Sequence, residues 1–227
     1  MTVERSGACV VLTFAHPVLS EAVLTELEAC LESLERDGGR RPLVLRSAHP
    51  TIFLAGAHLA EIARLDEPRS AAYARRGRAV LDRLAGHPAP TVAAVHGSCS
   101  GGGFDLALAC DRIVAAADAT FSHPGVRRGL VTGWGGTLRL PAAAGAALAS
   151  RAMVAGAPIT GRELAACGVA AAGGGDVVAA ALAIAERMAA VPPGRLWLWR
   201  AMRGSRSRRA AAARAIIGSA AVPLRSR

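Results

Sequence analysis

The chain has 227 residues, 52% of them hydrophobic, and a formal net charge of +10 at pH 7. This composition excludes a disordered protein, and the length suits one well-cored domain with a helical appendage. No apolar run approaches the ~20 residues that span a bilayer, and no charged-then-apolar leader precedes the first predicted strand. We therefore expect a soluble, cytoplasmic protein with no membrane partner.

The positive charge is concentrated near the C-terminus. All 27 basic residues are arginine, and nine of them fall between Arg195 and Arg227, where there is no acidic residue. Arginines attract phosphate groups, but no aromatic residue follows Trp199 to stack on nucleic-acid bases. We expect no nucleic-acid partner, and we interpret residues 205–227 as a short basic tail.

The five cysteines are scattered, without a Cys-x-x-Cys pattern, and the histidines are not paired at metal-ligand spacing. Isolated thiols of this kind act as small buried hydrophobic groups in a reduced protein. We therefore expect neither a disulfide framework nor a metal site.

The first part of the chain alternates predicted strands and helices. Short apolar runs predict strands at 10–14, 42–46, 91–95 and 112–116. Apolar positions at helical spacing predict helices at 20–36, 57–65 and 70–85. Pro68 is expected to interrupt the helical stretch between the last two. Because strands and helices alternate, we expect an α/β domain with parallel strand pairing.

From Gly135 onward the sequence is almost entirely helix-forming. Helices are expected at 135–154, 161–168, 176–190 and 194–203. The Gly173–Gly175 run is interpreted as a plain helix-to-helix connection, since no strand is predicted before it. The expected organisation is a core at 1–140, a helical region at 141–204 and the basic tail.

A glycine-rich turn at 97–103 joins the strand at 91–95 to a helical run at 104–110. Such a turn aims unpaired backbone N–H groups at one point, which suits a phosphate or the negative oxygen that develops on a reacting carbonyl. A nucleotide loop requires Gly-x-x-x-x-Gly-Lys or Gly-x-Gly-x-x-Gly. Neither pattern occurs in this chain, which contains no lysine. The sequence therefore favours an oxyanion site.

Several stretches resemble the enoyl-CoA hydratase/isomerase (crotonase) family. They are, in the family's order, 53–59, Ala94-Val95-His96-Gly97, Gly101-Gly102-Gly103, 106–111, 119–124 and 129–140. The resemblance covers residues 5–200. It implies a spiral of β-β-α turns with a C-terminal helical region and a homotrimer or hexamer. It also implies an acyl-CoA substrate, with coenzyme A as part of the substrate and no separate cofactor.

The family's shared step is the stabilisation of an enolate that forms at a CoA thioester. The resemblance assigns the two backbone N–H donors to Ala57 and Gly102, and losing one such donor typically costs ~3–4 kcal/mol in the transition state. Of the family's two catalytic glutamate positions, one is Asp105 in this chain and the other is Gly125, which has no carboxylate. His123 is a further candidate for the general acid or base.

Other positions are expected to bind the substrate. They are Ala55, Gly56, His58, Leu59, Gly101, Gly125 and Trp134.

Three functions remain open. The first is an acyl-CoA-processing enzyme of the hydratase/isomerase type, which is a lyase or an isomerase. The second is a malonyl-type CoA decarboxylase, because loss of CO₂ itself generates the enolate and needs fewer acid–base groups. The third is a non-catalytic CoA-binding or assembly subunit, since Gly125 lacks a carboxylate and Asp105 in a first helical turn can serve the helix dipole alone.

Overall fold

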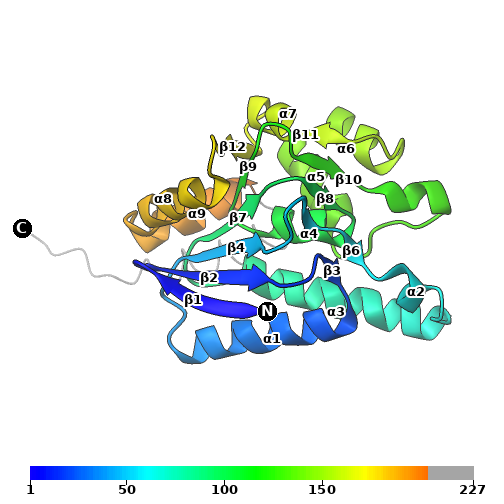
Figure 1. The fold of residues 1–227 in the computed structure, drawn as a ribbon, viewed down its shortest axis with the longest axis horizontal. Coiled ribbons are helices and arrows are strands. Elements are labelled where there is room, and N and C mark those ends of the chain that lie inside the picture. Colours follow the sequence, from blue (N-terminus) through cyan, green and yellow to red (C-terminus); the bar gives the residue numbers. More distant parts are fainter. Residues whose placement is uncertain (204–227) are drawn as a thin grey trace, which may run out of the picture.

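The computed structural model describes residues 1–203, which form sheets surrounded by helices (Figure 1). The strands are β1 (Thr2–Ser6), β2 (Cys9–Phe14), β3 (Val18–Leu19), β4 (Leu43–Ser47), β5 (Ile52–Leu54), β6 (Gly56–Ala57), β7 (Thr91–Val95), β8 (Ser98–Ser100), β9 (Arg112–Ala115), β10 (Thr120–Ser122), β11 (Ile159–Thr160) and β12 (Ala170–Ala172). The tail at 205–227 lies outside the described residues.

The helices lie between and after these strands. They are α1 (Glu21–Arg36), α2 (Leu59–Ile62), α3 (Glu67–Ala85), α4 (Gly102–Ala109), the 3₁₀ helix η1 (Pro124–Arg128), α5 (Gly136–Ala144), α6 (Ala146–Met153), α7 (Gly161–Ala166), α8 (Val177–Ala189) and α9 (Pro193–Arg203). Within residues 1–203 no single helix is long and apolar enough to cross a membrane, although the bent pair 177–189 and 194–200 passes by length and composition.

The chain winds as a spiral between two sheets. The larger sheet has the order β1-β2-β4-β7-β9-β12 and is parallel except for the β1–β2 hairpin. The smaller of these two sheets has the order β11-β10-β8-β5, and β3 and β6 form a separate two-stranded sheet. The path runs repeatedly from the larger sheet to the smaller sheet and then to a helix, as in β7–β8–α4. The expected α/β fold of β-β-α turns is therefore confirmed.

Both faces of the larger sheet are covered, and this explains why β7 is apolar throughout. Side chains on a strand alternate between the two faces. Val92 and Ala94 pack in a cluster with α8, whereas Ala93 and Val95 join the main core with α1, α3 and α4. Figure 1 shows α8 on the side of this sheet away from α1 and α3. All five residues of β7 are buried, as is typical of a central parallel strand.

Several predicted elements are confirmed, and their boundaries have clear local causes. Ser20 accepts a hydrogen bond from the amide of Val23 and starts α1 where it was expected. Pro68 does not interrupt a helix; it lies in the first turn of α3, where a missing N–H costs nothing. The helix expected at 135–154 is divided at Gly145, whose φ of 81° ends α5.

The prediction that no strand precedes Gly173–Gly175 is wrong. Residues 170–172 form β12, which pairs in parallel with β9 and closes one edge of the larger sheet. The segment Ala170–Ala172 has no β-branched residue, so its sequence carries no strand signal. The strands β1, β3, β5, β6, β8, β10 and β11 were not expected either.

A buried ion pair fastens α9 to the start of β7. The Nε of Arg200 donates to Asp111 Oδ1 at 2.6 Å, and its Nη1 donates to the carbonyl of His87 at 2.8 Å. Asp111 Oδ2 in turn accepts a hydrogen bond from the amide of Thr91 at 2.9 Å. Only 2% of Arg200 and 1% of Asp111 are exposed to solvent.

We expect Asp111→Ala to lower the free energy of unfolding by about 3–5 kcal/mol, because it removes the carboxylate that pairs with the buried guanidinium of Arg200. Urea titration followed by circular dichroism measures the change. Asp118→Ala is the matched control, since Asp118 is exposed, and it should stay within about 0.5 kcal/mol of the parent protein. A loss below about 1 kcal/mol for Asp111→Ala would contradict this role of the ion pair.

Candidate active site

Two glycine-bounded segments meet at the beginning of α4. Gly56 in β6 has a φ of +83°, and a β-carbon built on it would lie 2.7 Å from the amide nitrogen of Gly102. A β-carbon on Gly103 would lie 2.4 Å from the carbonyl oxygen of Leu54. The backbones of residues 54–57 and 100–103 are therefore in direct contact, and no side chain fits between them.

The amide of Gly102 is available for an external partner by its position in the helix. Gly102 is the first residue of α4, and the first N–H groups of a helix have no acceptor within it. The positive end of the helix dipole adds to the attraction for a negative atom at this point. Gly102 and Ala57 both line one cavity. This end of α4 is thus suited to hold an oxyanion.

The cavity has a volume of about 270 Å³ and is mostly apolar. It is lined by Ala55, Ala57, Leu59, Ile62, Tyr73, Gly101, Gly102, His123, Pro124, Gly125, Arg128, Leu130, Val131, Thr132 and Trp134.

Most of the site residues expected from the sequence lie around this cavity. The structure brings together Ala55, Ala57, Leu59, Gly101, Gly102, His123, Gly125 and Trp134. Gly56 is buried at the backbone contact, and Asp105 is completely buried. His58 is exposed at the start of α2 and is not among the residues that line the cavity. The roles of all of these residues stay predictions.

Trp134 forms a wall of the cavity and is 4% exposed. Its indole lies between two glycines: a β-carbon on Gly77 would come within 2.1 Å of the ring, and one on Gly102 within 2.5 Å. The ring of Tyr73 lies 5.5 Å from that of Trp134 between centroids. Trp134 therefore both lines the cavity and packs against the first residue of α4.

Asp105 and His123 form a buried pair next to the cavity. His123 Nε2 lies 3.5 Å from Asp105 Oδ1, and the His123 ring stacks on Phe104 with centroids 5.3 Å apart. The other oxygen, Asp105 Oδ2, accepts a short hydrogen bond from the hydroxyl of Thr132. Within residues 1–203, Asp105 Oδ1 and both ring nitrogens of His123 are buried without a hydrogen-bond partner. Polar atoms in this state are costly, and they are typical of functional sites.

Burial shifts the two pKa values of this pair in opposite directions. It raises the pKa of Asp105 to about 6, against the opposing effects of the Thr132 hydrogen bond and the charge of Arg139. It lowers the pKa of His123 to about 4. Both shifts disfavour the charged form, so at neutral pH the pair consists of a carboxylate and a neutral imidazole.

Sequence reasoning missed three residues that shape this pair and the cavity. Thr132 holds Asp105, and Gly136 must lack a side chain because its β-carbon would lie 1.9 Å from Asp105 Oδ1. Arg128 lines the cavity from η1. Thr132 and Gly136 lie within the segment 129–140 that carried the resemblance, but nothing in a single sequence marks their contact with Asp105.

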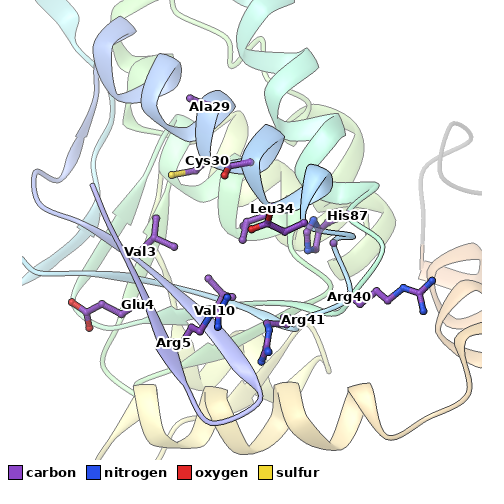
Figure 2. A pocket seen from close by; sticks show the side chains of 13 residues that line it. Val3, Glu4, Arg5, Val10, Ala29, Cys30, Leu34, Arg40, Arg41 and His87 are labelled. Carbon is purple, nitrogen blue, oxygen red and sulfur yellow. The ribbon is translucent and has the colours of Figure 1, made fainter.

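A larger cavity, of about 830 Å³, lies between the β1–β2 hairpin and α1 (Figure 2). His87, Arg40 and Arg41 line it, and they precede β7 and β4. It is therefore at the amino ends of the parallel strands, whereas ligands of α/β sheets bind at the carboxyl ends. None of the site residues expected from the sequence lines it. The smaller cavity is therefore the candidate active site.

Comparison with known proteins gives the family. The family model described as enoyl-CoA hydratase/isomerase matches residues 4–215. A probable enoyl-CoA hydratase of Bacillus subtilis is 36% identical over 190 residues, which are 81% of this chain and 73% of that protein. The mitochondrial methylglutaconyl-CoA hydratase of Rattus norvegicus is 38% identical over 66% of this chain, but the match spans only 48% of that protein.

A solved structure gives the same result for the fold. The crystal structure of an enoyl-CoA hydratase from Bacillus anthracis superimposes with a TM-score of 0.80 at 25% identity. The superposition covers 96% of this chain and 90% of that one.

The opposite pKa shifts predict opposite effects of pH on two variants. The pKa of Asp105 is about 6 in the folded protein and 3.8 in the unfolded chain. The folded protein therefore takes up this proton at higher pH, and the group adds stability as the pH falls from about 6 to about 4. The unfolded chain protonates His123 near 6.5 and the folded protein only near 4, so this group removes stability over that range.

We therefore expect His123→Gln to become more stable relative to the parent protein as the pH falls from about 6.5 to about 4. Asp105→Asn should become less stable relative to it from about pH 6 to about 4. Each change should be on the order of 2–3 kcal/mol, measured by urea unfolding at a series of pH values. Parallel stability curves for all three proteins would show that the pair is not perturbed in this way.

Proposed function

The chain belongs to the enoyl-CoA hydratase/isomerase family, and we propose that it stabilises a thioester enolate with the amides of Ala57 and Gly102. The observation that carries the proposal is the backbone contact of residues 54–57 with the first residue of α4, beside one cavity. Backbone donors keep a fixed geometry and do not titrate, so they act on charge as it develops. The substrate would be an acyl-CoA, whose thioester oxygen takes the position between the two amides.

For hydration of an enoyl-CoA, the water oxygen bonds to C3 and the electron pair of the double bond moves toward the thioester oxygen. C2 then takes a proton, which returns the pair from the oxygen and restores the thioester. One group must accept a proton from the water and one must supply a proton to C2. We assign both transfers to His123, which lines the cavity, and the stabilisation of its charged form to Asp105 behind it.

The charge states of His123 and Asp105 at neutral pH give the two residues different roles. With His123 neutral and Asp105 ionised, the Nε2–H of the imidazole would face Asp105 Oδ1, which lies 3.5 Å away, and Nδ1 would accept the proton. The carboxylate would then stabilise the imidazolium that forms, as in other carboxylate–histidine pairs. The resemblance places the family's second catalytic glutamate at position 125, where this chain has a glycine. Because that carboxylate is missing, we expect hydration to be slow.

Decarboxylation of a malonyl-type CoA is the second candidate, and Gly125 is the observation that favours it. The bond between C2 and the carboxylate breaks, its electron pair forms the enolate, CO₂ leaves, and C2 takes a proton. Such a reaction needs the oxyanion donors and a single proton donor, so one acid–base position fewer is required.

A homotrimer or hexamer, which the resemblance implies, is likewise a proposal for this chain.

The test is a turnover assay on enoyl-, malonyl- and 3-hydroxyacyl-CoA thioesters, read by mass spectrometry. We expect slow conversion of at least one thioester, reduced about 10²–10⁴-fold by Asp105→Asn. Asp118→Asn removes an exposed carboxylate on another loop and should leave the rate unchanged. Fast hydration of crotonyl-CoA that survives Asp105→Asn would refute the acid–base assignment. Binding of thioesters with no turnover would support a non-catalytic subunit.

A further inference from the structure

The cavity contains one permanent charge and no permanent charge of the opposite sign. Among the described residues that line it, the titratable ones are Tyr73, His123 and Arg128. Burial raises the pKa of Tyr73 and lowers that of His123, so both are neutral at pH 7. Asp105 is fully buried and does not line the cavity. Arg128, which is exposed to solvent, is thus the one permanent charge among the described residues that line the cavity.

Arg128 has no hydrogen-bond or ion-pair partner among residues 1–203, whereas the preceding arginine has one. The Nη2 of Arg127 donates to the carbonyl of Gly156 at 3.2 Å, and Arg127 does not line the cavity. Two adjacent arginines of the same short helix are therefore used differently. Arg127 bonds a neighbouring loop, and Arg128 lines the cavity without such a bond.

The position that would supply an internal partner for Arg128 is a glycine. Residues three apart in a 3₁₀ helix lie directly above one another, so Gly125 and Arg128 share one face of η1, and both line the cavity. Gly125 does not have a positive φ. A β-carbon on it would approach only Leu130, at 3.3 Å. The backbone conformation therefore allows a glutamate here once Leu130 gives way slightly, and that carboxylate would stand beside Arg128.

We propose that Arg128 selects acyl-CoA substrates whose acyl group carries a free carboxylate, which occupies the space left by Gly125. The proposal rests on the proposed function, since it takes the thioester to be held at Ala57 and Gly102 in the same cavity. A guanidinium binds a carboxylate through two parallel charge-assisted hydrogen bonds.

The experiment compares matched pairs of thioesters that differ only in a terminal carboxylate: succinyl-CoA with butyryl-CoA, and glutaryl-CoA with pentanoyl-CoA. Dissociation constants are measured by titration calorimetry, so the test does not depend on turnover. We expect Arg128→Gln to weaken binding of the carboxylated member about tenfold to hundredfold, and to change binding of the neutral member less than about twofold. Arg128→Lys should recover part of the loss.

Two further variants sharpen the comparison. Arg127→Gln, the neighbouring control, should leave both members of each pair unchanged. Gly125→Glu supplies Arg128 with an internal carboxylate, and should therefore weaken binding of the carboxylated member alone.

Three outcomes would overturn the proposal. An equal loss for both members after Arg128→Gln would place the arginine on the coenzyme A phosphates, and no loss for either would remove it from the site. A parent protein that binds both members equally well would contradict the selection while leaving the proposed function intact. Failure of the parent protein to bind any of the four thioesters would refute the proposed function itself.

Discussion

The backbone of Gly56 and the first residue of α4 approach each other so closely that no side chain can stand between them. The rest of the site depends on this contact, because it brings the amide at the start of a helix next to a second strand segment that ends at Ala57. Positive φ at Gly56 and Gly101 makes the approach possible. The β-β-α spiral supplies the geometry, since β5 and β8 are neighbours in the same sheet.

Two buried polar side chains next to the cavity lower the stability of the fold. Asp105 and His123 are buried with polar atoms that lack partners within the described residues, and each such atom costs about 1–3 kcal/mol. The fold holds them rigidly: Thr132 bonds the carboxylate, Phe104 stacks on the imidazole, and Gly136 leaves room for Oδ1. The shifted pKa values of Asp105 and His123 are of the kind that clusters at functional sites.

Sequence reasoning gave the strands and helices that have strong local signals, such as β7 with its run of buried residues and α1 with the Ser20 cap. It also brought most of the site residues to one cavity, because motifs in the family's order carry three-dimensional information. It could not give β12, whose three alanines form a strand only because β9 offers an edge. Nor could it give Thr132, whose contact with Asp105 joins segments distant in sequence, or Arg128, whose place in the cavity lining only the fold shows.

The central claim is that the amides of Ala57 and Gly102 jointly hold a thioester oxygen. A crystal structure with a bound, unreactive acyl-CoA tests it most directly. The account predicts that the thioester oxygen lies about 2.7–3.2 Å from both amide nitrogens, with the acyl chain directed toward Trp134 and Gly125. A thioester oxygen more than about 4 Å from either nitrogen, or an acyl-CoA bound in another cavity, would contradict it.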